Sequence, residues 1–178
     1  TYKEGSKVKE MMKLCIGKNT GAMFDANGKI VGGNATDKAL LNFLTQEEME
    51  KLTGLFVEKS QGFNSSNKYS ASQLNGKTVY KGAPERLLAK STKMLDENGN
   101  VVDINKNKIN SKIDELAIRA MRVLSFAYSE SGLVEDTLPD DLVIVGFVGI
   151  RDDVRMEAKQ AIEEVQNAGA QVVMITGD

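Results

Sequence analysis

The residues best suited to bind phosphate lie in a short run near the middle of the chain. Residues 81–85 read Lys-Gly-Ala-Pro-Glu and follow residues 78–80, which are rich in strand-forming side chains. Proline and glutamate are typical of the first turn of a helix, which we expect over residues 86–94. A strand ending at Lys81 and Gly82 would place a cation beside an unobstructed backbone. Taken alone, such a run is more often a surface turn than a nucleotide site.

A second candidate region lies near the C-terminus. Residues 142–150 and 172–175 are continuous apolar runs, as strands buried on both faces require. Between them we expect a helix that ends at Gly169. This predicts a strand-helix-strand crossover, and ligands of such sheets gather at the carboxyl ends of the strands. Arg-Asp-Asp at residues 151–153 and Thr-Gly-Asp at residues 176–178 fall at these ends. Helix capping would explain the aspartates at residues 151–153, but it does not explain Thr-Gly-Asp at residues 176–178.

Five motifs in chain order make the sequence resemble a P-type cation-transporting ATPase, with the calcium-pump-like subgroup as the nearest likeness. This family consists of membrane ion pumps that pass through an aspartyl-phosphate. The motifs are Gly-Asn-Ala-Thr-Asp-Lys-Ala-Leu at residues 33–40, similar to the family's Gly-x-x-Thr-Glu-x-Ala-Leu; Phe63 with Lys68; the run at residues 81–85; Asp152 with Arg155, in a segment similar to Asp-Pro-Pro-Arg; and Met-Ile-Thr-Gly-Asp at residues 174–178.

The resemblance implies an α+β fold in two parts. Residues 1–138 would form the nucleotide-binding domain, an antiparallel sheet flanked by helices. Residues 139–178 would form the β-α-β start of a Rossmann-like phosphorylation domain. The family's Asp-Lys-Thr-Gly-Thr and Gly-Asp-Gly-x-Asn-Asp motifs do not occur in the sequence. We therefore expect an excised cytosolic piece that binds ATP without turnover and contains no catalytic residue. Its expected partners are ATP and the phosphorylation, actuator and transmembrane domains of a parent that also uses Mg²⁺.

The resemblance also assigns roles to single residues. Phe63 would stack on adenine, since a ring with apolar faces needs an aromatic partner, and its neighbours are polar rather than apolar. Lys68 and Lys81 would meet the phosphates as point charges. The nucleotide-binding set is Asp37, Phe63, Lys68, Lys81, Gly82, Arg122 and Leu124; the phosphate or domain-interface set is Asp152, Arg155, Thr176, Gly177 and Asp178.

Some positions depart from the family's pattern. Asn34 stands where the family often has glutamate, and Ser65 stands where it often has arginine. Fewer charged contacts should weaken nucleotide binding. Asp153 and Val154 replace the usual Pro-Pro, so the turn into the last helix should be less rigid.

Composition excludes several other functions. The net charge of −2 offers no basic field for nucleic acid, and the absence of histidine rules out histidine-based triads or zinc sites within this chain. We expect no metal site. The longest apolar run is nine residues, whereas a membrane-spanning helix needs roughly 20. We expect the piece to be soluble and its parent to lie in a bacterial plasma membrane. Two alternatives stay open: a stand-alone nucleotide-binding regulator, and a fragment of a haloacid-dehalogenase-class phosphatase.

Shorter patterns predict the remaining elements. A strand is expected over residues 122–128, where the resemblance decides against a longer helix, and a linker over residues 132–141. Two helices are expected near the N-terminus, one over residues 7–16 and one that begins after a cap at Thr36. A third should run from a Thr45–Glu48 capping box to about residue 59, and a fourth should begin at Ser111. Hairpin turns are expected at residues 25–28, 75–76 and 98–99.

Overall fold

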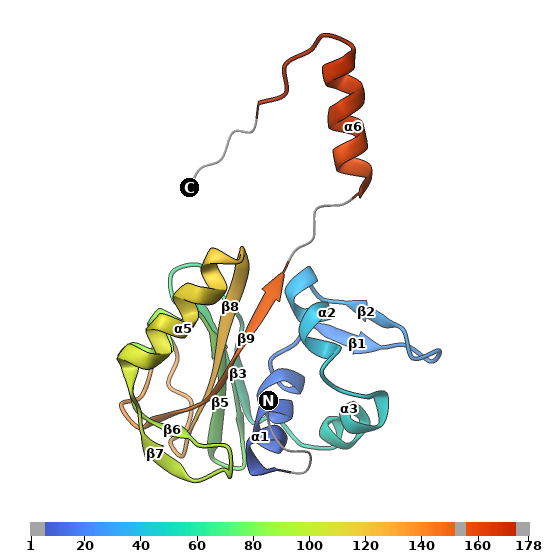
Figure 1. Ribbon diagram of the computed structural model, residues 1–178. Helices are drawn as coiled ribbons and strands as arrows, with labels where there is room; N and C mark the ends of the chain where they lie inside the picture. The colour runs from blue at the N-terminus through green and yellow to red at the C-terminus, as the bar shows by residue number, and fades with distance from the viewer. Residues whose placement is uncertain (1–5, 152–155, 174–178) are drawn as a thin grey trace.

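The computed structural model describes residues 6–151 and 156–173. Its centre is a seven-stranded sheet of order β3-β4-β5-β8-β9-β6-β7 (Figure 1). All neighbours are antiparallel except β6 and β9, which run parallel. The strands are β3 (Lys59–Gln61), β4 (Tyr69–Leu74), β5 (Lys77–Gly82), β6 (Ser91–Leu95), β7 (Val101–Asp103), β8 (Met121–Ser129) and β9 (Leu142–Arg151). A mainly antiparallel sheet with helices confirms the expected α+β class.

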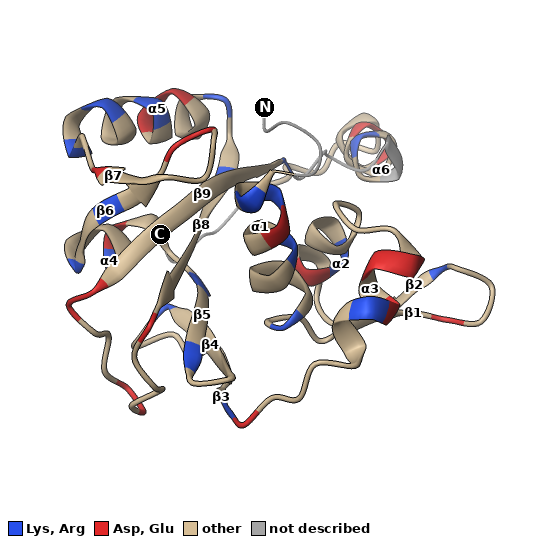
Figure 2. Cartoon of the chain, turned by 90° about the horizontal axis from the view of Figure 1, so that it is seen from below, with Lys and Arg blue, Asp and Glu red and all other residues tan. Residues whose placement is uncertain are grey.

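Helices cover both faces of this sheet (Figure 2). On one side lie α1 (Lys7–Gly17), α2 (Ala35–Leu41) and α3 (Gln46–Thr53), together with the hairpin of β1 (Ala22–Phe24) and β2 (Ile30–Gly32). On the other side lie α4 (Pro84–Ala89) and α5 (Lys106–Ile118). The last helix, α6 (Met156–Asn167), is drawn apart from the sheet in Figure 1.

The two faces of the sheet bury separate cores because strand side chains alternate in direction. Val79 and Phe126 pack in the core under α1, whereas their neighbours Tyr80 and Ala127 pack in the core under α4. The only cysteine, Cys15, is fully buried in the α1 core, where desolvation raises the pKa of its thiol. The alternation fixes which side chains of β5 face the α1 side, and Lys81 is among them.

Several predicted elements are confirmed, including the helix at residues 7–16, the three hairpins, the Thr45–Glu48 capping box and the strand at residues 122–128. Some boundaries were wrong. Helix α2 is capped by Asn34 rather than Thr36, because the Asn34 side chain accepts a hydrogen bond from the backbone N–H of Asp37. Helix α3 ends at Thr53 rather than near residue 59, and α5 begins at Lys106, before Ser111.

The helix expected over residues 86–94 is also shorter than predicted. Helix α4 ends at Ala89, and residues 91–95 form β6 instead. The Ser91 hydroxyl donates to the carbonyl of Leu87 (2.7 Å), which closes the last turn of α4. Strand β6 then fills the place between β9 and β7. Tertiary pairing therefore overrides local helix propensity at this segment.

The largest correction concerns residues 142–150. They form the expected strand, but it lies in the same sheet as the preceding strands; of the expected partner strand over residues 172–175, residues 174–175 lie outside the described residues. Strand β9 lies inside the seven-stranded sheet, paired with β8 on one edge and β6 on the other. The pairing with β8 extends to Arg151, whereas the pairing with β6 covers residues 142–144. Residues 172–173 are not in a strand. Helix α6 and the left-handed Gly169 (φ +82°) after it agree with expectation. The division at residue 138 stays a prediction.

The structure offers no candidate for crossing a membrane. Over residues 6–151 and 156–173, every helix is too short or too polar for that purpose.

Candidate functional site

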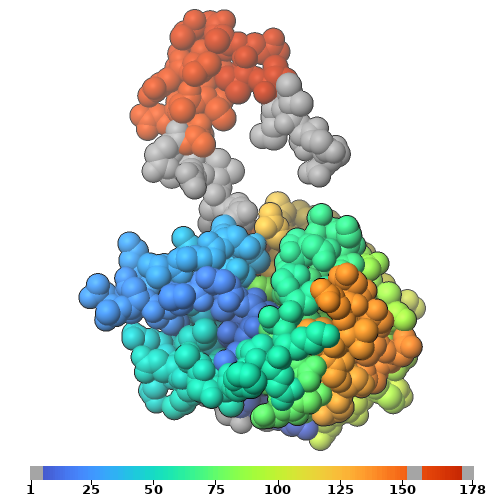
Figure 3. All heavy atoms as spheres, turned by 180° about the vertical axis from the view of Figure 1, so that it is seen from behind, coloured from blue at the N-terminus to red at the C-terminus, as the bar shows by residue number. Residues whose placement is uncertain are grey.

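A cavity of about 690 Å³ lies between the α1–α2 side of the molecule and the strands β3, β4 and β5. In Figure 3 the surface is hollowed between the blue N-terminal elements and the teal-green residues that follow β3. Six of the seven residues predicted to bind nucleotide line this cavity. They are Asp37, Phe63, Lys81, Gly82, Arg122 and Leu124.

A buried ion pair forms the floor of the cavity. The Lys81 ammonium donates to Asp37 Oδ1 (2.7 Å) and to the backbone carbonyl of Asn19. Each of the two charged residues is only 8% exposed. Charges at such depth need partners, because burial removes their hydration. Lys81 is therefore committed to protein groups, a partnership that the sequence analysis did not foresee.

Asp37 is held from a second direction. Its Oδ2 accepts a hydrogen bond from the backbone N–H of Gly21 (3.1 Å). Gly33 lies beside this contact with a left-handed backbone (φ +59°), and a Cβ there would stand 2.7 Å from the backbone nitrogen of Ala22. Glycine is thus required for the close approach of β2 to β1 next to Asp37. We call Asn19, Gly21, Asp37 and Lys81 the cleft floor.

Gly82 is required for a different close approach. A Cβ at this position would lie 2.6 Å from Cβ of Tyr69 and 2.7 Å from the carbonyl oxygen of Lys68. Even the methyl group of alanine would not fit at this position unless β4 moved. The glycine of the Lys-Gly run therefore permits the tight contact between β5 and the start of β4, and it leaves the cavity wall free of a side chain.

Phe63 stands on the loop between β3 and β4, which we call the rim loop (residues 62–68). Its side chain is 65% exposed, yet it lines the cavity. A large aromatic ring that borders a cavity without being buried is available to stack on a flat ligand. Phe56 is also exposed, at 78%, but is not part of the cavity lining.

Arg122 and Leu124 reach the cavity from β8. Arg122 Nη1 donates to the hydroxyl of Thr36 (3.1 Å), which joins β8 to α2. Met121, the preceding residue, pairs with Arg151 at the end of β9. Arg122 therefore lies at the end of the cavity that is near the last residue of β9, where the chain leaves the sheet.

Lys68 is the predicted nucleotide-binding residue that the cavity does not include. Its backbone is left-handed (φ +58°), and its ammonium pairs with Glu85 at 3.2 Å on the exposed surface. Its carbonyl accepts a hydrogen bond from the backbone N–H of Ala83 (2.9 Å). Lys68 therefore joins the rim loop to the start of α4. The second predicted set, Asp152, Arg155, Thr176, Gly177 and Asp178, lies outside the described residues.

Several polar residues of the cavity are not predicted from the sequence. Asn19 is 8% exposed, and its amide donates to the carbonyls of Cys15 (3.0 Å) and Val79 (3.3 Å). Ser70 and Ser72 line the wall from β4, and Ser72 donates to the carbonyl of Lys18 (2.7 Å). Partial burial lowers the pKa of the Lys18 ammonium. The sequence Asn-Thr-Gly at residues 19–21 is typical of any loop that follows a helix. It therefore contains no local pattern that predicts a place for Asn19 in the cavity.

Comparisons with known proteins show the family to which the chain is similar. A family model described as P-type ATPase, cytoplasmic domain N, matches residues 7–157. A putative plasma-membrane-type calcium-transporting ATPase 13 of Arabidopsis thaliana is 33% identical over 89% of the chain, and calcium-transporting ATPase 1 of Saccharomyces cerevisiae is 36% identical over 88%. Calcium-transporting ATPase 1 of Bacillus cereus is 39% identical over 57%.

The chain spans only 18% of the length of the plant and yeast relatives and 12% of the bacterial one. The family match covers the sheet, its flanking helices and every residue of the cavity lining. The resemblance inferred from the sequence motifs is therefore confirmed. This chain belongs to the P-type ATPase family, whose cytoplasmic domain N it contains.

Proposed function

We propose that the cavity binds ATP and that the chain is the nucleotide-binding module of a calcium-transporting P-type ATPase. The single observation that carries this proposal is the convergence of six residues, taken from four separate segments between positions 37 and 124, on one cavity. The sequence motifs alone predict a nucleotide-binding role for each of the six. The match to domain N supports the same function.

The proposed pose follows from the chemistry of the lining. Phe63 stacks on the adenine ring at the rim. Asp37, held by Lys81 and the N–H of Gly21, keeps unused lone pairs that can accept a hydrogen bond from the exocyclic amino group. The phosphates extend past Arg122 toward the end of β9, where the segment with Asp152 continues. In this pose Lys81 acts chiefly by holding Asp37, and the direct phosphate contact expected from the sequence remains a prediction.

The cavity does not fit a magnesium ion. Asp37 is the one carboxylate among its described lining residues, and both of its oxygens already accept hydrogen bonds from protein groups. Magnesium prefers several oxygen ligands and keeps its waters. We therefore assign the magnesium requirement, the aspartyl-phosphate and ion translocation to other parts of a membrane-embedded parent. The isolated chain binds nucleotide without hydrolysing it, at sub-millimolar to millimolar affinity on the order expected for an incomplete site.

The test is a titration of ATP by calorimetry or by chemical-shift change. Phe63→Ala should lose about 1–3 kcal/mol of binding free energy, as removal of base–aromatic stacking does elsewhere. Phe56→Ala is the matched control, because it removes an exposed phenylalanine that does not line the cavity. Equal affinity of the Phe63→Ala variant and the parent chain would show that ATP binds elsewhere or not at all.

A further inference from the structure

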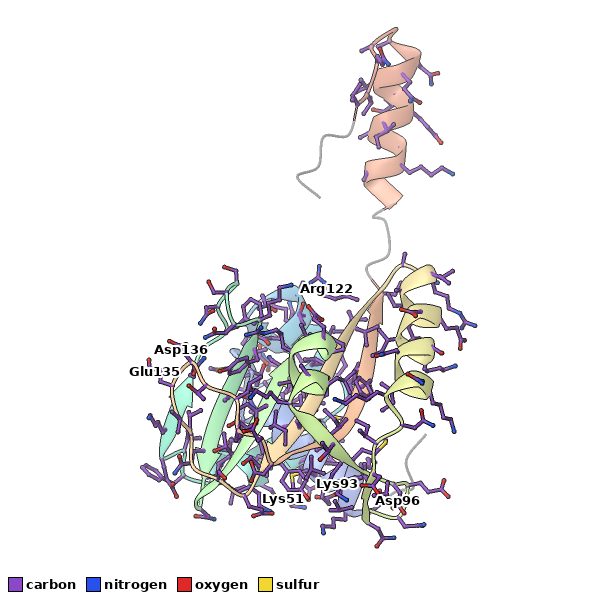
Figure 4. The ribbon with its side chains drawn as sticks, turned by 90° about the vertical axis from the view of Figure 1, so that its left-hand side faces the viewer. Lys51, Lys93, Asp96, Arg122, Glu135 and Asp136 are labelled. Carbon is purple, nitrogen blue, oxygen red and sulfur yellow. The ribbon has the colours of Figure 1, made fainter. Side chains whose placement is uncertain are left out.

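The rim loop that carries Phe63 is fastened at both ends to one residue of a distant segment. Asp136 belongs to the loop between β8 and β9, which runs beside β3 and β4 (Figure 4). Its carboxylate Oδ1 accepts hydrogen bonds from Gln61 Nε2 (3.3 Å) and from Asn67 Nδ2. Gln61 is the last residue of β3, just before the rim loop, and Asn67 is the loop's penultimate residue.

Asp136 also uses its backbone in this contact. Its N–H donates to Gln61 Oε1 (2.9 Å), so Gln61 and Asp136 exchange two hydrogen bonds. The backbone of Asp136 is left-handed (φ +56°), an uncommon conformation for a residue other than glycine. This conformation persists only where surrounding contacts hold it, and here these contacts lie at the two ends of the rim loop.

The segment around Asp136 is itself anchored to the sheet. Lys59 donates to the carbonyl of Leu133 (3.1 Å), and the N–H of Leu133 donates to the side chain of Gln73 (2.6 Å). Leu133 is buried in the core under α4. Asp136 therefore has a rigid base from which to hold the rim loop.

Inside the rim loop the restraints are few. Asn64 accepts hydrogen bonds from the backbone N–H groups of Asn67 (2.7 Å) and Lys68 (2.8 Å). Gly62, next to Phe63, has no neighbouring atom within 4 Å of an added Cβ. The orientation of Phe63 thus depends on how the ends of the loop are held.

We propose that Asp136 is a positioning residue for adenine binding: it clamps Gln61 and Asn67 and so presets the rim loop with Phe63 over the cavity. This inference rests on the proposed function, since it concerns the same ring. Holding a loop in its bound conformation raises affinity by reducing the entropy lost on binding. Asp136 is not among the residues that line the cavity, whereas its partner Gln61 is, so Asp136 acts on the ring through Gln61 and Asn67.

The test compares Asp136→Ala with Glu135→Ala. Both variants remove one exposed acid from the same loop, and Figure 4 labels the two side chains. Among the described residues, Glu135 has no hydrogen-bond or ion-pair partner. Asp136→Ala should weaken ATP and adenosine equally, roughly threefold to tenfold, since the clamp acts on the ring and not on the phosphates. Glu135→Ala should stay within about twofold, and Asp136→Asn, which keeps the acceptor oxygen and the backbone N–H, should bind as the parent does.

A double-mutant cycle separates positioning from general stability. In a Phe63→Ala background, Asp136→Ala should cause no further loss of adenosine affinity, because the ring to be positioned is gone. The melting temperature of Asp136→Ala should lie within about 3 °C of the parent. An undiminished loss in the Phe63→Ala background, or unchanged affinity of Asp136→Ala, would overturn the inference.

Asn67→Ala serves as a second variant, since it removes the other partner of the clamp from outside the cavity lining. It should reproduce the loss seen with Asp136→Ala, and parent-like affinity would count against the clamp. If Phe63→Ala itself leaves ATP binding intact, the proposed function fails. If only the Asp136 and Asn67 variants bind normally, the clamp alone is wrong.

Discussion

The cleft floor and the rim loop serve one cavity but are held by different forces. The floor is a buried ion pair between Lys81 and Asp37, supported by backbone groups of Asn19 and Gly21. The rim loop carries an exposed ring and is held by hydrogen bonds between exposed side chains, together with one backbone hydrogen bond from Ala83 to Lys68. Breaking a buried pair leaves an uncompensated charge, whereas breaking exposed hydrogen bonds lets water replace them. We therefore expect floor mutations to affect folding and binding together, and rim mutations to affect binding alone.

Lys81→Ala should give the largest effect, a loss of about 3–5 kcal/mol in the free energy of unfolding, because Asp37 would be left buried without its cation. Lys68→Ala, which breaks an exposed pair, should cost under about 1 kcal/mol. Urea denaturation measures both values. A small loss for Lys81→Ala would contradict the distinction between floor and rim.

The affinities of Lys81→Ala for ATP and for adenosine distinguish two possible roles of the lysine. Adenosine and ATP should weaken by similar factors if Lys81 acts by holding Asp37. A much larger loss for ATP would instead support the phosphate contact expected from the sequence. The double variant Lys81→Met with Asp37→Asn, which removes both charges, should recover part of the lost stability.

Gly82→Ala should come next, with a loss of about 1–3 kcal/mol, because the added methyl group meets the backbone and Cβ of Tyr69 at less than 3 Å. Gly62→Ala on the rim loop is the matched control, since nothing lies within 4 Å of its added Cβ. Thermal unfolding of the two variants tests the contrast. Comparable melting temperatures would mean that β4 yields to the methyl group.

Arg122→Gln should give the smallest effect, because this residue lies at the open end of the cavity. ATP affinity should fall by about fivefold with no change for adenosine, and the difference should shrink as salt is added. Arg119→Gln, which alters a pair with Glu115 on α5 away from the cavity, should leave both affinities unchanged. An equal loss for adenosine would assign Arg122 to the ring end of the site.

The failures of sequence-based prediction in this chain share a cause. Residues 86–94 have helix-forming side chains, but the second half of that run pairs with β9 and becomes β6. The apolar run at residues 142–150 predicts a strand but not its neighbours β8 and β6, since a strand buried on both faces looks the same in any sheet. The phosphate contact predicted for Lys81 stays a prediction, and the sequence gives no local signal for its ion pair with Asp37, 44 residues earlier.

Local sequence by itself determined the Thr45–Glu48 capping box, the three hairpin turns and the motif residues that surround the cavity. These features depend on contacts within a few residues, or on motifs whose order along the chain is informative. Only the tertiary structure decided that Lys81 pairs with Asp37, that Asn19 completes the floor, and that Asp136 reaches both ends of the rim loop. Such contacts join residues 44 to 75 positions apart, and they exist because strand order and burial bring those segments together.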